Sequence, residues 1–236
     1  MKELVQCWAV VPAAGTGSRM GEKIPKQYLP LRGSTIIEHT LQRLASSSCI
    51  AGIVVAVAAD DGWWPTVKPD INKPLVTVSG GVERCHSVLN AVNKLIAMSQ
   101  RNEWVLVHDA ARPCVRVADI ERLVSTLQDS PVGGLLGAPV NDTVKRADSS
   151  GTVVATVERE GLWRALTPQM FRLQPLHDAL VSAISSRKLV TDEASAMELA
   201  GFAPLLVEGH ADNIKITRPA DLAMAEFFLQ QQDNPG

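Results

Sequence analysis

The chain has 236 residues, of which 46% are hydrophobic, and its net charge at neutral pH is −2. A chain of this composition can bury a substantial core, and its balanced charge excludes the overall basic surface typical of nucleic-acid or anionic-membrane binding. Because the N-terminus does not resemble a leader and no apolar run approaches roughly 18 residues, we expect a soluble cytoplasmic protein without a membrane or nucleic-acid partner.

Short apolar runs alternate with helix-like segments along the chain. The runs predict strands at 7–14, 52–59, 75–81, 104–110, 133–140, 204–209 and 213–217. Apolar spacing and cap residues predict helices at 34–46 behind the cap candidate Ser34, at 84–98, around 120–127, after Thr191 and Asp192, and near Pro219. The strands are continuously apolar, so both faces of their sheet should be covered. This predicts an α/β fold with a mostly parallel sheet, in one domain over 1–236.

One segment, 142–159, departs from this alternation. It reads "DTVKRADSSGTVVATVER", two polar-alternating strands around a Ser-Ser-Gly turn without a helix between them. We expect a projecting β-hairpin arm over about 139–160, with Thr143 and Arg159 approximately opposite each other at its base. An arm with few core contacts needs a second surface, and an identical subunit related by a two-fold axis is the simplest one, so the segment predicts a homodimer.

The loop after the first strand, "AAGTGSRMGEKIPK", favours an anion site. It fails the G-x-G-x-x-G fingerprint because Met20 stands in place of the third glycine, and it also fails the P-loop pattern. A small-residue turn still lets backbone N–H groups approach a phosphate, and Arg19 and Lys26 add cations. Together they indicate a nucleoside triphosphate, although a tight turn with two solvated cations remains the alternative.

Two further motifs add candidates. The strand "WVLVHDA" brings Asp109 to its carboxyl end, where a carboxylate facing a triphosphate is most simply explained as a Mg²⁺ ligand, with a cap of the next helix or turn as the alternative. Arg112 is a candidate for a second anionic substrate, whereas His108 should face away from Asp109 and be packed. The motif "SGGVERCHSV" offers backbone contact to a flat base at Gly81. The four cysteines lack a C-x-x-C pair, so we expect reduced thiols rather than a disulfide framework or a zinc site.

Eight segments in order carry a resemblance to a known family. They are "VVPAAGTGSRM", "PKQYLPL", "GGVERCHSV", "VLVHDAARP", "NDTVKR", "LWRALTPQMF", "TDEASAME" and "DNIKITRPADL". The chain resembles the 2-C-methyl-D-erythritol 4-phosphate cytidylyltransferases of the non-mevalonate isoprenoid pathway. The resemblance implies a Rossmann-like three-layer fold, CTP and methylerythritol phosphate as substrates, Mg²⁺ or another divalent cation, and a homodimer whose arms reach the neighbouring active sites.

The resemblance also implies a role for each matching residue. The catalytic set is Arg19, Lys26 and Lys215. The nucleotide set is Pro12, Ala13, Ala14, Gly15, Thr16, Gly17, Arg19, Lys26, Gly81, Val82, Ser87 and Ala110. The substrate set is Asp109, Arg112, Thr143, Arg159, Thr167, Thr191 and Lys215, with Thr143 and Arg159 supplied by the second subunit and Asp109 also binding the metal. Val82 stands where the family often has aspartate, which puts cytosine selectivity in question if that position reads the base through its side chain.

The implied reaction is attack of a phosphate monoester oxygen on the α-phosphorus of CTP, with pyrophosphate leaving in line. Both reactants are anions, so positioning and charge stabilisation should dominate, and no general base is required. Two alternatives remain open: a ribitol 5-phosphate cytidylyltransferase and a non-catalytic nucleotide-binding regulator. "VVPAAG" and "HDAARP" disfavour the first, and the presence of Lys26, Asp109 and Lys215 disfavours the second.

Overall fold

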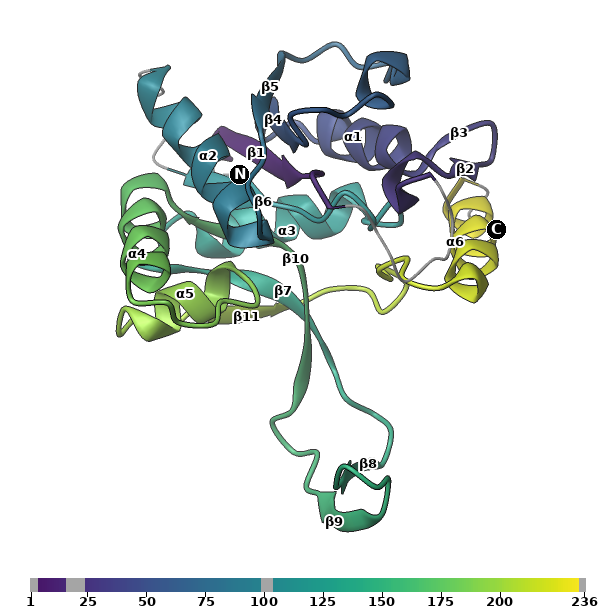
Figure 1. Ribbon diagram of the computed structural model, residues 1–236, viewed down its shortest axis with the longest axis vertical. Helices are drawn as coiled ribbons and strands as arrows, with labels where there is room; N and C mark the ends of the chain where they lie inside the picture. The colour runs from purple at the N-terminus through teal and green to yellow at the C-terminus, as the bar shows by residue number, and fades with distance from the viewer. Residues whose placement is uncertain (1–3, 16–23, 99–103, 234–236) are drawn as a thin grey trace.

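The computed structural model describes residues 4–15, 24–98 and 104–233 (Figure 1). Its centre is a seven-stranded sheet in the order β11-β7-β10-β6-β1-β4-β5. The strands are β1 (Cys7–Pro12), β4 (Ile50–Val57), β5 (Leu75–Ser79), β6 (Trp104–Val107), β7 (Gly133–Pro139), β10 (Trp163–Arg172) and β11 (Leu205–Glu208). Only β10 runs antiparallel to its neighbours β6 and β7, so the predicted mostly parallel sheet is confirmed.

Helices cover both faces of this sheet. One face carries α1 (Ile36–Ser46) and α3 (Val117–Leu127), and the other carries α2 (Arg84–Ala97), α4 (Leu173–Ser185) and α5 (Glu193–Leu199). Along β1, Ala9 and Val11 pack in the first layer and Trp8 and Val10 in the second, as the pleat requires. This alternation explains why the strand is continuously apolar, and it confirms the three-layer α/β expectation.

Smaller elements close one end of the molecule. The strands β2 (Pro30–Leu31) and β3 (Ser34–Thr35) pair with each other, and α6 (Pro219–Asp233) packs near them through Ala225 and Leu229. Two short 3-10 turns, η2 (Lys26–Tyr28) and η3 (Trp64–Thr66), complete the set. None of the helices in the described part of the chain is long and apolar enough to cross a membrane.

Two expectations about these elements were wrong, and one central strand was not predicted. The segment 213–217 is not a strand; it runs as an irregular segment with a backbone hydrogen bond from Ile216 to Ala111. The strand β10 was not predicted, because Pro168 and the polar residues around it hide a central strand. The helix α1 is capped by Thr35 rather than Ser34, and Glu38 closes a capping box with Thr35.

The predicted arm is present as a two-stranded hairpin, β8 (Val144–Ala147) with β9 (Val153–Val157), which extends away from the sheet in Figure 1. Gly151 has a φ of +85°, and the Asp148 carboxylate accepts the N–H groups of Ser150 and Thr152, which fixes the turn. At the base, Val144 pairs with Val157 and Arg159 donates a hydrogen bond to the carbonyl of Asn141. Residues 141–144 therefore lie against 157–159, as the folding of the hairpin predicts.

Candidate active site

A cavity of about 300 Å³ opens at the carboxyl ends of β1, β5 and β6, the edge at which open α/β sheets bind ligands. Its walls come from five segments that are distant in the sequence. They are Pro12, Ala13, Ala14 and Gly15; Lys26 and Gln27; Gly81, Val82, Glu83, Arg84 and Ser87; Asp109, Ala110 and Ala111; and Lys215 and Thr217. The structure thus brings most of the predicted nucleotide residues, Asp109 and both predicted lysines to one hollow.

The loop after β1 is held in place by hydrogen bonds from the side chain of Gln27. The buried Gln27 amide donates to the carbonyl of Ala13 at 2.7 Å and to the carbonyl of Gly15 at 3.1 Å. These two bonds hold the backbone of the loop beside the cavity, which Gln27 also lines, and sequence reasoning did not identify Gln27. The predicted residues Thr16, Gly17 and Arg19 lie outside the described residues.

The opposite wall depends on close approach at two glycines. A Cβ on Gly80 would lie 2.3 Å from the Cβ of Ala14, so the strand end and the β1 loop can touch only because residue 80 is glycine. The N–H of Gly81 donates to the buried hydroxyl of Ser87 at 3.0 Å, which holds the turn against the first turn of α2. Val82 is fully exposed at the rim of the cavity.

Asp109 is the centre of the charge on the cavity floor. Its Oδ1 lies 3.0 Å from Arg84 Nε, and its Oδ2 lies 2.9 Å from Lys215 Nζ and 3.3 Å from Arg112 Nε. Burial alone would raise the pKa of this carboxyl, but the neighbouring Arg84, Lys215 and Arg112 hold it well below its usual range. The carboxylate is therefore ionised, and it orients three cations toward one place.

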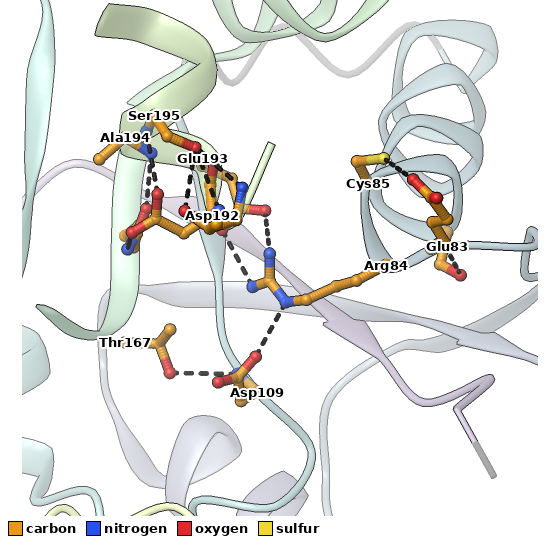
Figure 2. Close-up of polar contacts among 12 residues, drawn as sticks. Glu83, Arg84, Cys85, Asp109, Thr167, Asp192, Glu193, Ala194 and Ser195 are labelled. Carbon is orange, nitrogen blue, oxygen red and sulfur yellow. Dashed lines mark hydrogen bonds and ion pairs between the residues drawn. The ribbon is translucent and has the colours of Figure 1, made fainter. Parts of the chain in front are cut away.

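Arg84 connects Asp109 to a second carboxylate, and sequence reasoning missed this link. Figure 2 shows the guanidinium between Asp109 and Glu193, whose oxygens lie 2.6 and 3.0 Å from Arg84 Nη1 and Nη2. Glu193 is 1% exposed at the start of α5, and Asp192 caps that helix by accepting the N–H of Ser195. Burial disfavours the charged guanidinium, but Glu193 and Asp109 outweigh it and raise the pKa of Arg84. The pair ties α2 to α5 directly beside the cavity.

Thr167 and His108 position Asp109 from behind. The imidazole is fully buried, which lowers the pKa of His108 to about 4 and keeps the ring neutral. Its Nε2 lies 3.1 Å from the carbonyl of Arg112, which can only accept, so Nε2 carries the proton and Nδ1 accepts from the Thr167 hydroxyl at 2.9 Å. The same hydroxyl oxygen accepts the N–H of Asp109 at 3.1 Å. His108 is packed, as expected.

The two predicted lysines meet on the cavity wall. Lys26 donates from Nζ to the carbonyl of Ile216 at 2.9 Å, which places its ammonium beside the residue that follows Lys215. Both side chains line the cavity, and that of Lys215 is 38% exposed. Two lysine side chains from distant parts of the sequence thus line one wall of the cavity.

The remaining predicted substrate residues do not line this cavity. Arg112 lies behind Asp109 and donates to the carbonyl of Asn213 at 2.7 Å. The Thr167 hydroxyl already makes hydrogen bonds with His108 and the N–H of Asp109. Thr191 lies against Ser195 at the start of α5. Thr143 and Arg159 belong to the base of the arm. The roles given to these five residues stay predictions.

The donor set around Asp109 can accept a divalent cation in one way. Both carboxylate oxygens already face cations, so an ion would have to replace one of them. Lys215 is the most exposed of the three partners, so it is the one that an ion would displace most readily. Mg²⁺ binds through one or two carboxylates plus phosphate oxygens, so one carboxylate and a triphosphate are a sufficient set. Asp109 fits a ligand role under this exchange.

Comparisons with known proteins identify the family of this chain. The family model described as 2-C-methyl-D-erythritol 4-phosphate cytidylyltransferase matches residues 7–231. A protein of that name from Vibrio atlanticus is 53% identical over 223 residues, 94% of this chain and 95% of its own length. Another from Hahella chejuensis is 50% identical over 224 residues, 95% of this chain and 93% of its own length.

Solved structures give the same result. A crystal structure of 4-diphosphocytidyl-2C-methyl-D-erythritol synthase matches with a TM-score of 0.83 and 36% identity, covering 97% of this chain and all of the other. The 2-C-methyl-D-erythritol 4-phosphate cytidylyltransferase of Francisella tularensis matches with a TM-score of 0.80 and 37% identity, covering 94% of this chain and 99% of the other. The chain belongs to the 2-C-methyl-D-erythritol 4-phosphate cytidylyltransferase family.

Proposed function

We propose that this protein transfers the cytidylyl group of CTP to 2-C-methyl-D-erythritol 4-phosphate, forming 4-diphosphocytidyl-2-C-methyl-D-erythritol and pyrophosphate in isoprenoid precursor biosynthesis. The family supports the activity. The observation that carries the residue roles is the single cavity in which a small-residue loop, two lysines and Asp109 converge. We treat the whole chain as one nucleotidyltransferase domain from which the arm projects.

The nucleotide binds between the β1 loop and the start of α2. The base lies against the backbone of Gly81 and Val82, and the triphosphate lies over residues 12–15 near Lys26. Because the Val82 side chain is fully exposed at the rim, reading of the base at this position runs through the backbone. Arg19 completes the charge on the triphosphate.

The reaction is an in-line displacement that these groups position and stabilise. A phosphate oxygen of methylerythritol phosphate attacks the α-phosphorus, the bond to the β-phosphate oxygen breaks, and pyrophosphate leaves with its electron pair. Lys26 and Lys215 lie where negative charge develops, and pre-positioned cations act there without the reorganisation that water would need. A monoester phosphate is already nucleophilic at neutral pH, so no side chain has to remove a proton.

A divalent cation, Mg²⁺ or another of the same class, supplies further charge neutralisation of the triphosphate when bound. Asp109 is the residue that would hold it, with Lys215 released toward the substrate phosphate. Arg112, behind Asp109, keeps the carboxylate ionised and oriented during this exchange.

The protein acts as a homodimer in which each arm supplies Thr143 and Arg159 to the neighbouring site. The arm supports this proposal because Val153 and Val154 are 59% and 63% exposed on it, and a second subunit would cover them. We place the enzyme in the cytoplasm, where CTP is made and where its free, buried cysteines stay reduced.

The test is pyrophosphate release by the purified full chain with Mg²⁺. CTP is compared with ATP, and methylerythritol phosphate is compared with ribitol 5-phosphate. We expect rapid release only with CTP and methylerythritol phosphate together. Faster release with ribitol 5-phosphate would reassign the acceptor, and no release with either acceptor would leave the protein as a nucleotide binder.

A further inference from the structure

Three different metal-binding side chains gather at the start of α2, outside the set that the reaction uses. They are Glu83, Cys85 and His86, and their donor atoms all lie within 4.8 Å of one another. Cys85 Sγ lies 3.7 Å from Glu83 Oε2 and 3.8 Å from His86 Nδ1. Figure 2 shows the Glu83 carboxylate facing the Cys85 thiol. The cysteine spacing did not predict this cluster, because only one of the three groups is a cysteine.

The spacing of the three atoms suits a tetrahedral ion. Bonds of roughly 2.0–2.3 Å place the ligands of a tetrahedral zinc ion about 3.3–3.8 Å apart. The two measured sulfur distances already lie at this separation, so a small rotation of the exposed Glu83 completes the triangle. Thiolate, imidazole and carboxylate together select zinc-class ions over Mg²⁺, which prefers oxygen alone.

The local structure leaves these donors available. Glu83 occupies the N-cap position of α2, yet its side chain makes no capping hydrogen bond, and its carboxylate forms no ion pair with any described residue. Arg84, between the ligands in sequence, points the other way toward Asp109 and Glu193 (Figure 2). Burial and the neighbouring Glu83 carboxylate raise the pKa of the Cys85 thiol, so the thiolate forms only when an ion supplies the compensating positive charge.

The cluster shares a wall with the nucleotide cavity. Glu83 lines the cavity, and a Cβ on Gly81 would lie 2.3 Å from the Cβ of His86. The turn at Gly81 is thus packed directly on His86, and it continues along the chain into Glu83. Turning the Glu83 carboxylate toward an ion would change the cavity wall against which the base lies.

We propose that Glu83, Cys85 and His86 form a binding site for a zinc-class divalent ion, and that ion binding weakens nucleotide binding in the adjoining cavity. As the metal–sulfur bond forms, the Cys85 S–H bond breaks and its proton passes to solvent. The first half stands on the geometry alone, and the second half rests on the proposed function.

The metal site is tested with Co²⁺ on the full chain as a spectroscopic probe. We expect a thiolate-to-cobalt charge-transfer band that saturates near one equivalent, is lost in Cys85→Ser and persists in the control Cys114→Ser. Cys114 is buried like Cys85 but lies against Ala225, far from the cluster in the fold. The variant His86→Gln should weaken Co²⁺ binding by about tenfold or more, because one of three protein ligands is lost. A band that is absent, or that survives Cys85→Ser, overturns the site.

The effect on the nucleotide is tested separately. In Mg²⁺ buffer, added Zn²⁺ should raise the KM for CTP at least several-fold in the wild type and in Cys114→Ser, and leave it unchanged in Cys85→Ser. An unchanged KM in the wild type overturns the coupling. Failure of the proposed function would look different, because pyrophosphate release would then be absent without Zn²⁺ while the cobalt band remained.

Discussion

The cavity and the arm hold their polar residues in opposite ways. Around the cavity, Asp109, Arg84 and Glu193 are locked by short ion pairs to groups on three different elements. On the arm, both strands are almost entirely exposed, and the hairpin is held by its own ladder and by the Asp148 turn. A site that is pre-positioned by the core is therefore combined with an arm whose apolar residues still need a surface. Changes to the cavity should act within one subunit, and changes to the arm should act between subunits.

The largest expected effect is on the cavity side. Lys26→Ala should lower kcat by about 100- to 1,000-fold, because a pre-positioned cation is lost where charge develops. Turnover is measured by pyrophosphate release, and circular dichroism checks the fold. Lys94→Ala, on the exposed side of α2, is the matched control and should keep full turnover. Near-normal turnover in Lys26→Ala would remove this lysine from the catalytic set.

The arm side is tested by subunit mixing. Arg159→Ala and Lys26→Ala should each be nearly inactive alone. In a mixed dimer, one of the two sites receives an intact cavity and an intact arm, so a random 1:1 mixture should recover about a quarter of wild-type activity. The mixture is assayed after unfolding and refolding together, with heterodimers verified by mass. Verified heterodimers without activity would place Arg159 in the site of its own chain.

The buried link between α2 and α5 is expected to matter for both stability and turnover. Glu193→Gln leaves the Arg84 guanidinium with Asp109 as its charged partner, and we expect a loss of about 2 kcal/mol in the free energy of unfolding. Urea denaturation measures this loss. The exposed Glu198→Gln on the same helix is the control and should be neutral. Equal stability of the two variants would show that the Arg84 pair contributes nothing.

The last expected effect is on stability alone, a pH dependence from His108. Its folded-state pKa of about 4 lies below the unfolded value near 6.5, so the unfolded chain takes up a proton first as the pH falls. Stability from this residue is fully present above pH 6.5 and is lost as the pH drops toward 4, by about 2 kcal/mol between pH 7 and pH 5. Urea denaturation at both pH values should show a smaller difference in His108→Gln. An unchanged difference would assign the pH dependence to other groups.

Much of the fold could be predicted from local pattern, and the exceptions have physical causes. Continuous apolar strands and period-3.6 helices predicted the covered, mostly parallel sheet. The strand β10 was missed because Pro168 interrupts it, and 213–217 was mistaken for a strand because two isoleucines flank Lys215. The cap of α1 was misplaced by one residue because Ser34 and Thr35 are adjacent and both suited to capping.

The candidate site was predicted where one loop carries the chemistry and missed where distant residues meet. Asp109 and the small-residue loop follow strands, so their edge of the sheet could be foreseen. Arg84 and Glu193 are 109 residues apart in the sequence, and the residues around either one do not predict that the two side chains pair. A charged residue in the first turn of each helix, "GGVER" and "TDE", was the only available signal.

The strand β10 has a further consequence for how two subunits can be arranged. Its first residue, Trp163, lies next to the arm and pairs with Pro139 of β7, and four and six residues further along β10 contributes Thr167 and Gln169 beside Asp109 and Asp192. The direction in which the hairpin projects is therefore set by the paired stretch of β7 and β10 from which it extends. A chimera that takes its arm from a relative would also need that relative's paired stretch of β7 and β10. A junction placed further out on the arm would no longer fix the direction in which the arm projects.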